Sequence, residues 1–248
     1  YPLGLNMLKN LRSYCKVPVI VGGVFATFAP HKVIKEDCVD MLCRGDGENT
    51  LIELCERMKR GQDYSDIKGL WINKDGKIFK NPLHQPTNIN NLPFPDFNIF
   101  EEKRLFRPMA GNIYKMLPIE THRGCPFQCA YCNSPASKEL YHKEIANPFF
   151  RKKSIKKIFD EISYLFKIWN FEYIYFPADT FLSMSNSEFE EFAERYIDFK
   201  LPFWIQTRPE TLNEINVKRL KEIGCHRVSI GIEHGNEIFR KKIIKRIV

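Results

Sequence analysis

The chain of 248 residues has no long apolar run. Its longest apolar stretch, Val17–Ala26, is interrupted by Pro18 and by the pair Gly22 and Gly23, and it is much shorter than the roughly 20 apolar residues that cross a bilayer. At the N-terminus of this sequence no basic segment leads into an apolar core with a small-residue cleavage site. These absences argue against a membrane span. The chain starts at Tyr1 without a methionine, so we expect a piece of a longer protein.

A disulfide framework is also absent. Five of the eight cysteines are scattered through segments that we interpret as core: Cys15, Cys38, Cys43, Cys55 and Cys225. Such use of cysteine suits a reducing compartment. We therefore expect a cytoplasmic protein.

The net charge of +8 comes from 38 Lys and Arg against 30 Asp and Glu. Basic residues concentrate in Lys138–Lys157 and in Arg240–Arg246. One interpretation is a nucleic-acid surface, but stacking aromatics do not alternate regularly with these charges as they do in single-strand binders. We interpret both segments as solvated helix faces and expect no nucleic-acid partner.

The first ninety residues alternate between strand and helix patterns. Short apolar strands at 17–21 and 39–43 end in glycine loops, and helix patterns follow at 29–36 and 48–60. This order is typical of a doubly wound, Rossmann-like parallel sheet, on which ligands bind at the loops. Gly69–Lys80 has the pattern of a hairpin that turns at Lys74–Gly76. We place the first domain at residues 1–92.

A segment rich in proline, Asn and Asp follows, and we interpret residues 93–115 as a linker. From residue 116 to 248 a second series begins, with strands at 117–121, 173–176, 203–207 and 227–232 and helices at 155–169, 187–199, 213–223 and 236–247. Four such units in a row predict part of a (β/α) barrel, whose active site lies at the carboxyl ends of its strands. The fold class that we expect is therefore α/β, with a Rossmann-like part followed by a partial barrel.

Cys125, Cys129 and Cys132 follow the first strand of this series in the sequence Thr-His-Arg-Gly-Cys-Pro-Phe-Gln-Cys-Ala-Tyr-Cys. Three thiolates are one short of a closed structural zinc site, whereas an iron–sulfur cluster held by three cysteines keeps one iron open for a ligand. A zinc loop completed by His122 or His142 is the alternative. A zinc knuckle has no reason to precede a series of strand and helix units.

The Cys-x3-Cys-x2-Cys loop resembles the cluster loop of the radical S-adenosylmethionine (radical SAM) superfamily. The resemblance implies that the three cysteines hold a [4Fe–4S] cluster whose fourth iron chelates the amino and carboxylate groups of S-adenosylmethionine. It further implies reductive cleavage of S-adenosylmethionine to methionine and a 5′-deoxyadenosyl radical. Tyr131 would then lie near the adenine.

Three further residues directly follow strands and are candidates for contacts with S-adenosylmethionine. Asp179 occupies the place where many family members have Gly-Gly-Glu, and an ordinary helix N-cap is its alternative role. Glu233 resembles the ribose-contacting segment of the family, with a solvated charge as the alternative. Arg208 is the third candidate, and it could instead pair with a carboxylate for structure alone.

The segments before the cysteines resemble the cobalamin-binding domain that precedes the barrel in one large radical SAM class. The matching segments, in chain order, are 19–26, 39–50, 69–70 and 92–96. The resemblance implies backbone contacts to cobalamin at Gly22, Gly23 and Gly45, where a Cβ would intrude. The Asp-x-His-x-x-Gly motif of that domain would lie before Tyr1, and the family barrel has six strands where four are predicted here, so we expect both ends to be cut.

The resemblance implies an enzyme that cleaves S-adenosylmethionine reductively, with cobalamin-dependent methyl transfer to an unreactive centre of a small-molecule substrate as its outcome. It also implies an electron donor such as flavodoxin or ferredoxin. Two alternatives stay open. One is a radical SAM cyclisation, rearrangement or methylthiolation without methylcobalamin, and the other, from a different class, is a metal-binding nucleic-acid module.

Overall fold

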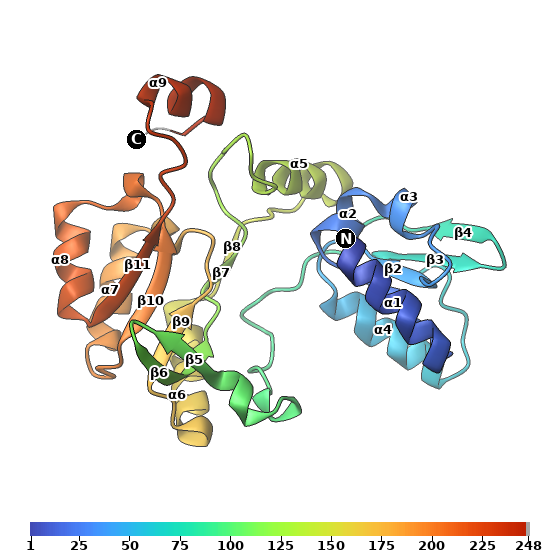
Figure 1. The fold of residues 1–248 in the computed structure, drawn as a ribbon, viewed down its shortest axis with the longest axis horizontal. Coiled ribbons are helices and arrows are strands. Elements are labelled where there is room, and N and C mark those ends of the chain that lie inside the picture. The colour runs from blue at the N-terminus through green and yellow to red at the C-terminus, as the bar shows by residue number, and fades with distance from the viewer. Residues whose placement is uncertain (247–248) are drawn as a thin grey trace. The chain divides into compact units, whose positions relative to one another are not determined.

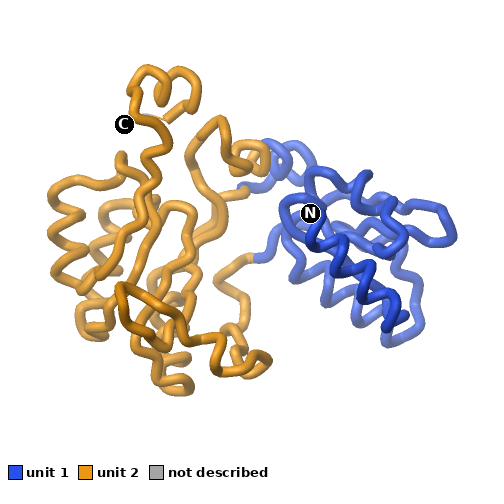
Figure 2. Tube along the Cα trace, in the orientation of Figure 1, with its two compact units in different colours: residues 1–87, 139–148 blue, residues 88–138, 149–248 orange. Residues whose placement is uncertain are grey.

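The structure, a computed structural model, describes residues 1–246. The chain divides into two compact units, one made of residues 1–87 and 139–148 and the other of residues 88–138 and the chain from Phe149 onward (Figure 2). The second division falls within the helix α5 (Ser134–Ile145). Among the described residues, no helix has both the length and the apolar character that a bilayer crossing needs.

The first unit contains a sheet of four strands in the order β1-β2-β3-β4 (Figure 1). These strands are β1 (Ile20–Val21), β2 (Met41–Cys43), β3 (Leu70–Lys74) and β4 (Lys77–Lys80). β1 and β2 are parallel, whereas β3 is antiparallel to both β2 and β4. The predicted hairpin is present, with Asp75 and Gly76 at φ values of 51° and 79° in its turn, as a tight two-residue hairpin requires.

The helices of the first unit are α1 (Pro2–Tyr14), α2 (Val24–Phe28), α3 (Pro30–Val33) and α4 (Glu48–Lys59). The helix predicted at 29–36 is shorter in the structure, where α3 covers only Pro30–Val33, and Ala29 separates it from α2. Pro30 causes this break, since a residue before proline is disfavoured in the helical region, and Ala29 has φ −121°.

Two apolar clusters occupy the two faces of this sheet, because side chains alternate along each strand. Leu42 and Trp71 belong to the cluster that contains Ala26 and Val33. Their neighbours on the same strands belong to the other cluster, which has the following members: Met41, Leu54, Ile67, Leu70 and Ile72. The sheet therefore has a buried layer on each side, as the doubly wound pattern predicts.

The second unit is built on a sheet of five strands in the order β11-β10-β9-β6-β5 (Figure 1). Its strands are β5 (Phe106–Met109), β6 (Asn112–Pro118), β9 (Tyr173–Phe176), β10 (Phe203–Thr207) and β11 (Cys225–Ile230). β6, β9, β10 and β11 are mutually parallel where they pair, and β5 is antiparallel to β6. A separate ribbon joins β7 (His122–Arg123) to β8 (Arg151–Lys152).

Helices α6 (Ile155–Trp169), α7 (Asn186–Tyr196) and α8 (Glu214–Glu222) connect the parallel strands. Ser154 begins α6 by accepting a hydrogen bond from the backbone N–H of Lys157 at 3.1 Å, and Asn170 ends the helix in the left-handed conformation. The buried face of α6 packs against the sheet in one cluster with Ile174 and Phe203. The predicted fold class, a Rossmann-like part followed by a partial barrel, is confirmed.

Two segments differ in detail from the sequence-based expectation. Residues 93–115, expected as a linker, contain the 3-10 turns η1 (Phe97–Ile99) and η2 (Glu102–Leu105), then β5 and the start of β6. The helix predicted at 236–247 is shorter and is not one regular α-helix: α9 (Glu237–Phe239) passes into a π-helical turn, η5 (Arg240–Ile244), which ends at Lys245 in the left-handed region. Residue 247 lies outside the described residues.

Candidate functional site

The cysteine loop begins directly after β7. Gly124 has φ +78°, and a Cβ at this position would lie 2.8 Å from the ring of Phe149. Only glycine fits this close approach in the left-handed region. The next residue is Cys125, so the direction in which the loop leaves the ribbon is determined by this glycine.

The three loop cysteines have different surroundings. Cys125 and Cys129 are buried, whereas Cys132 is exposed. Cys125 Sγ lies 3.6 Å from Thr180 Oγ1. Cys129 Sγ accepts a hydrogen bond from Arg208 Nη1 at 2.7 Å, and Cys132 Sγ accepts one from the backbone N–H of Ser134 at 3.4 Å.

One cavity of about 420 Å³ brings together all seven cluster and S-adenosylmethionine residues that the sequence predicted. Its lining includes Cys125, Cys129, Tyr131, Cys132, Asp179, Arg208 and Glu233. Asp179 follows β9, Arg208 follows β10 and Glu233 follows β11. The carboxyl ends of the parallel strands therefore supply the cavity, as expected for a barrel active site.

Asp179 does not cap a helix. The N-cap of the following 3-10 turn η3 (Phe181–Ser183) is Thr180. Burial raises the pKa of the Asp179 carboxyl, because desolvation disfavours the charged form. The helix-cap alternative is therefore wrong, and the residue is a partly desolvated acid on the cavity wall.

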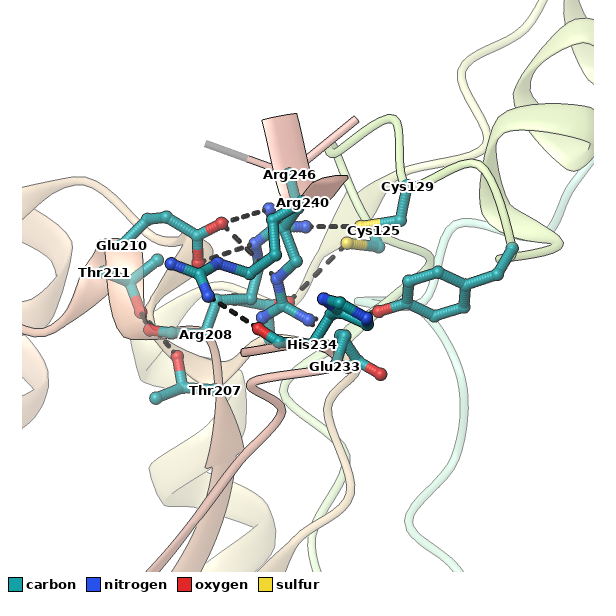
Figure 3. Close-up of polar contacts among 12 residues, drawn as sticks. Cys125, Cys129, Thr207, Arg208, Glu210, Thr211, Glu233, His234, Arg240 and Arg246 are labelled. Carbon is teal, nitrogen blue, oxygen red and sulfur yellow. Dashed lines mark hydrogen bonds and ion pairs between the residues drawn. The ribbon is translucent and has the colours of Figure 1, made fainter. Parts of the chain in front are cut away.

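Arg208 is held on two sides. Its Nη2 and Nε atoms donate to the Glu210 carboxylate at 2.6 and 3.3 Å, while Nη1 donates to Cys129 Sγ (Figure 3). Burial alone would lower the pKa of Arg208, but hydrogen bonds and charges from Glu210 and Cys129 raise it overall. The structural pairing left open for Arg208 is therefore present, together with a direct contact to a cluster cysteine.

Glu233 occupies a strained position. Its φ is +68°, which costs a non-glycine residue stability and is found preferentially at functional sites. Glu233 Oε1 accepts a hydrogen bond from Arg246 Nη1 at 2.7 Å, and the same Nη1 donates to Tyr131 Oη at 3.0 Å. Burial, together with hydrogen bonding to Glu233, raises the pKa of Tyr131 to about 12.

Sequence reasoning missed Arg246. The run Arg240–Arg246 was interpreted as a solvated helix face, which is wrong for Arg246, because only 2% of this residue is exposed and it lines the cavity. No sequence signal distinguishes it from the other basic residues nearby. Lys153, in the other basic segment, is also buried, and it pairs with Glu161 at 2.7 Å.

The three glycines that we expected to contact cobalamin lie in the first unit, and their surroundings differ. Gly22 lines an apolar cavity of about 460 Å³ between α1 and the end of β1. Gly23 has φ +91°, and a Cβ there would meet nothing within 4 Å. A Cβ on Gly45 would lie 3.1 Å from Tyr141 Oη and 3.2 Å from Leu83, so Gly45 packs against the protein itself.

The donor set at the cysteine loop fits an iron–sulfur cluster. Within residues 1–246, no three Cys, His, Asp or Glu side chains converge closely enough to hold a metal ion, since each thiol has a different neighbour. The three thiols nevertheless line one cavity large enough for a cluster and part of a ligand. Arg208 places a positive charge beside Cys129, which suits a cluster held by thiolates.

The sequence model of the radical SAM superfamily matches residues 119–247. The chain belongs to this superfamily, whose members use S-adenosylmethionine and a [4Fe–4S] cluster. The loop cysteines and the strand ends that form the cavity all lie within the matched region.

Relatives extend the similarity to the first unit. An uncharacterised methyltransferase of Pyrococcus horikoshii is 29% identical over 234 residues, which cover 92% of this chain and 47% of that protein. An anaerobic magnesium-protoporphyrin IX monomethyl ester cyclase of Rubrivivax gelatinosus is 28% identical over 227 residues, covering 88% of this chain and 39% of the cyclase. The chain thus spans less than half of the length of these relatives.

Two solved structures share the fold. The radical S-adenosylmethionine methyltransferase TsrM from Kitasatospora setae superposes with a TM-score of 0.69 at 17% identity, over 96% of this chain and 45% of TsrM. The cobalamin-dependent S-adenosylmethionine radical enzyme OxsB superposes with a TM-score of 0.65 at 21% identity, over 98% of this chain and 35% of OxsB. Both matches include the Rossmann-like unit as well as the partial barrel.

Proposed function

We propose that the protein cleaves S-adenosylmethionine reductively at a [4Fe–4S] cluster and uses cobalamin to transfer a methyl group to an unreactive centre. The observation that carries this proposal is the convergence of three loop cysteines with Tyr131, Asp179, Arg208 and Glu233 on one cavity wall. These residues come from four separate places in the sequence, which makes a chance assembly a poor explanation.

In this proposal Cys125, Cys129 and Cys132 hold the cluster. When bound, the cluster supplies the electron that cleaves the sulfonium, and a donor such as flavodoxin or ferredoxin supplies that electron in turn. Arg208 donates a hydrogen bond to Cys129 Sγ and places a positive charge beside the proposed cluster ligand. Its pairing with Glu210 fixes the guanidinium in place.

Asp179 and Glu233 orient the nucleoside and amino acid parts of S-adenosylmethionine. A carboxylate accepts hydrogen bonds from two ribose hydroxyls or from an ammonium group. The raised pKa of Asp179 shows that its carboxyl is partly desolvated, and desolvation strengthens a hydrogen bond to a charged partner. Tyr131 adds an aromatic ring at the cavity edge for the adenine.

We propose cobalamin as the second cofactor, bound by the domain at residues 1–92, with residues 93–115 as the connection to the barrel domain at 116–248. Gly22 supports this proposal best, because it lines an apolar cavity of about 460 Å³. Its main chain is therefore accessible to a ligand in that cavity. TsrM and OxsB have been solved with cobalamin bound.

Methyl transfer is favoured over the other radical SAM outcomes by the relatives. Two of them are named as uncharacterised methyltransferases and one as a cytidylyl-2-hydroxyethylphosphonate methyltransferase. Other relatives are named as a cyclase and as a putative methylthiotransferase. One measurement distinguishes methyl transfer from these alternative reactions: whether bound methylcobalamin loses its methyl group during turnover.

We also propose a small-molecule substrate and a cytoplasmic location.

The proposal is tested with the protein over its full natural length, purified and reconstituted without oxygen. We expect iron and sulfide in equal amounts and 5′-deoxyadenosine after reduction. Zinc without sulfide would overturn the cluster assignment. Cys129→Ala should abolish both the cluster and the nucleoside product, whereas the exposed Cys55, substituted by alanine, should leave both unchanged.

A nucleic-acid module is tested separately. Binding to a non-specific duplex that falls steeply with salt would revive this alternative. The burial of Arg246 and Lys153 removes two of the charges on which it depended.

A further inference from the structure

Arg208 has a buried guanidinium that contacts a carboxylate, an aromatic ring and one loop cysteine. Its side chain is 8% exposed. The Nε and Nη2 atoms donate to the Glu210 carboxylate, whereas Nη1 donates to Cys129 Sγ (Figure 3). The guanidinium also lies over the ring of Phe127 in the cysteine loop, with its Cζ atom 4.0 Å from the ring centroid. Arg208 is therefore held against the loop by two of the loop's own residues.

The partners that the structure gives to the other two loop cysteines are neutral. Cys125 Sγ lies 3.6 Å from the hydroxyl oxygen of Thr180. Cys132 Sγ accepts a hydrogen bond from the backbone N–H of Ser134 at 3.4 Å. The donor at Cys129 differs from both, because it carries a full positive charge, and hydrogen bonds from charged donors are the stronger kind.

Glu210 offsets the charge of Arg208 only in part at the sulfur atom. The carboxylate pairs with the guanidinium edge formed by Nε and Nη2, and Nη1 on the other side faces Cys129. The positive group is thus nearer to the sulfur than the negative group, and Coulomb energy falls with distance. The cavity lining holds three further charged residues, which stay the same when Arg208 is replaced: Asp179, Glu233 and Arg246.

We propose that Arg208 raises the reduction potential of the [4Fe–4S] cluster held by the loop cysteines. This inference rests on the proposed function, and it assigns Arg208 to the cluster and not to S-adenosylmethionine. In the reduction, one electron passes from the external donor to the cluster, no bond forms or breaks, and no proton moves. The added negative charge is shared by the cluster and its sulfur ligands, so a charged N–H donor at Cys129 stabilises the reduced form more than the oxidised form.

The test measures the midpoint potential of the cluster in the full-length protein, reconstituted anaerobically with iron and sulfide alone. The potential is set with mediators, and electron paramagnetic resonance reports the reduced cluster. The variants are Arg208→Gln and Arg208→Lys, and the matched control is Arg219→Gln. Arg219 also pairs with two carboxylates, Glu190 and Glu222, but it lies on α8 and does not line the cavity.

We expect Arg208→Gln to lower the midpoint potential. At the midpoint of wild type, the ratio of reduced to oxidised cluster should fall about tenfold, as the loss of one hydrogen bond from a charged donor predicts, which is a shift of about 59 mV for one electron. Arg208→Lys keeps the charge without the planar fork, so it should cause a smaller fall. Arg219→Gln should keep the wild-type potential.

Two results would overturn the inference and leave the proposed function standing. One is a wild-type potential in Arg208→Gln at full iron and sulfide content, and the other is an equal shift in Arg219→Gln. Equilibrium dialysis with S-adenosylmethionine identifies the competing role, because at least tenfold weaker binding with an unchanged potential would assign Arg208 to that ligand.

Iron and sulfide content identify a variant that does not assemble the cluster. If Arg208→Gln is such a variant, Arg208→Lys carries the comparison, and an unchanged potential in that protein refutes the inference. A wild-type protein that assembles no iron–sulfur cluster would instead refute the proposed function itself.

Discussion

His122 should make the protein sensitive to mild acid. Its ring is 3% exposed and lies between Thr121 Oγ1, 3.1 Å from Nδ1, and Ser183 Oγ, 3.3 Å from Nε2. Burial, reinforced by the charge of Lys152, lowers its pKa from 6.5 to about 4. The native state therefore holds this ring neutral at pH values where the unfolded chain protonates it.

The sign and size of the change in stability follow from proton linkage. Between pH 6.5 and about 4 the unfolded state binds more protons than the native state at His122, so the free energy of unfolding falls as the pH is lowered. The loss relative to neutral pH is about 2 kcal/mol at pH 5 and about 3 kcal/mol at pH 4. The carboxylates are the same in wild type and in a His122 variant, so their contribution to the pH dependence cancels when the two proteins are compared.

The assay is urea unfolding of reduced, metal-free protein, followed by tryptophan fluorescence from pH 7 to 4, for wild type and His122→Gln. The difference in unfolding free energy between the two proteins should change by about 3 kcal/mol across this range, with wild type losing more. His142→Gln, at an exposed position, should follow wild type. Parallel curves for wild type and His122→Gln would refute the reasoning.

Two glycine substitutions test the packing around the site. Gly124→Ala should lose cluster binding, because its Cβ would lie 2.8 Å from the ring of Phe149 at φ +78°; iron content measures this, and full loading would contradict the close approach. Gly231→Ala should weaken S-adenosylmethionine at least tenfold, because its Cβ would collide with the Glu233 carboxylate and displace it. Equilibrium dialysis measures that loss, and unchanged affinity would show that Glu233 is not held where the structure has it.

The sequence predicted the site residues that follow strands. Asp179, Arg208 and Glu233 were identified because parallel strands bring their carboxyl ends to one edge, and the cavity contains all three. To predict such residues, only the order of strands and helices must be known, and hydrophobic periodicity indicates that order. The three cysteines were identified from their spacing alone.

Other features of the structure depend on contacts that local sequence patterns do not predict. Arg246 is buried two residues after Ile244, whose backbone oxygen accepts a hydrogen bond from Ala130, far away in the sequence. The helix predicted from 236 to 247 ends earlier, at Ile244, and helix propensity does not predict the π-helical turn at Arg240–Ile244. The role of Gly45 in packing against Tyr141 likewise requires the folded first unit.

The contact between Ala130 and Ile244 has a consequence for how the protein is made. During synthesis the cysteines leave the ribosome long before Arg208 and Ile244, which give the loop its neighbours in the finished protein. Until then the Cys129 thiol lacks its guanidinium partner, and the Ala130 N–H lacks its backbone acceptor at Ile244. If the loop cysteines hold a cluster as proposed, we expect its insertion to follow translation of this region.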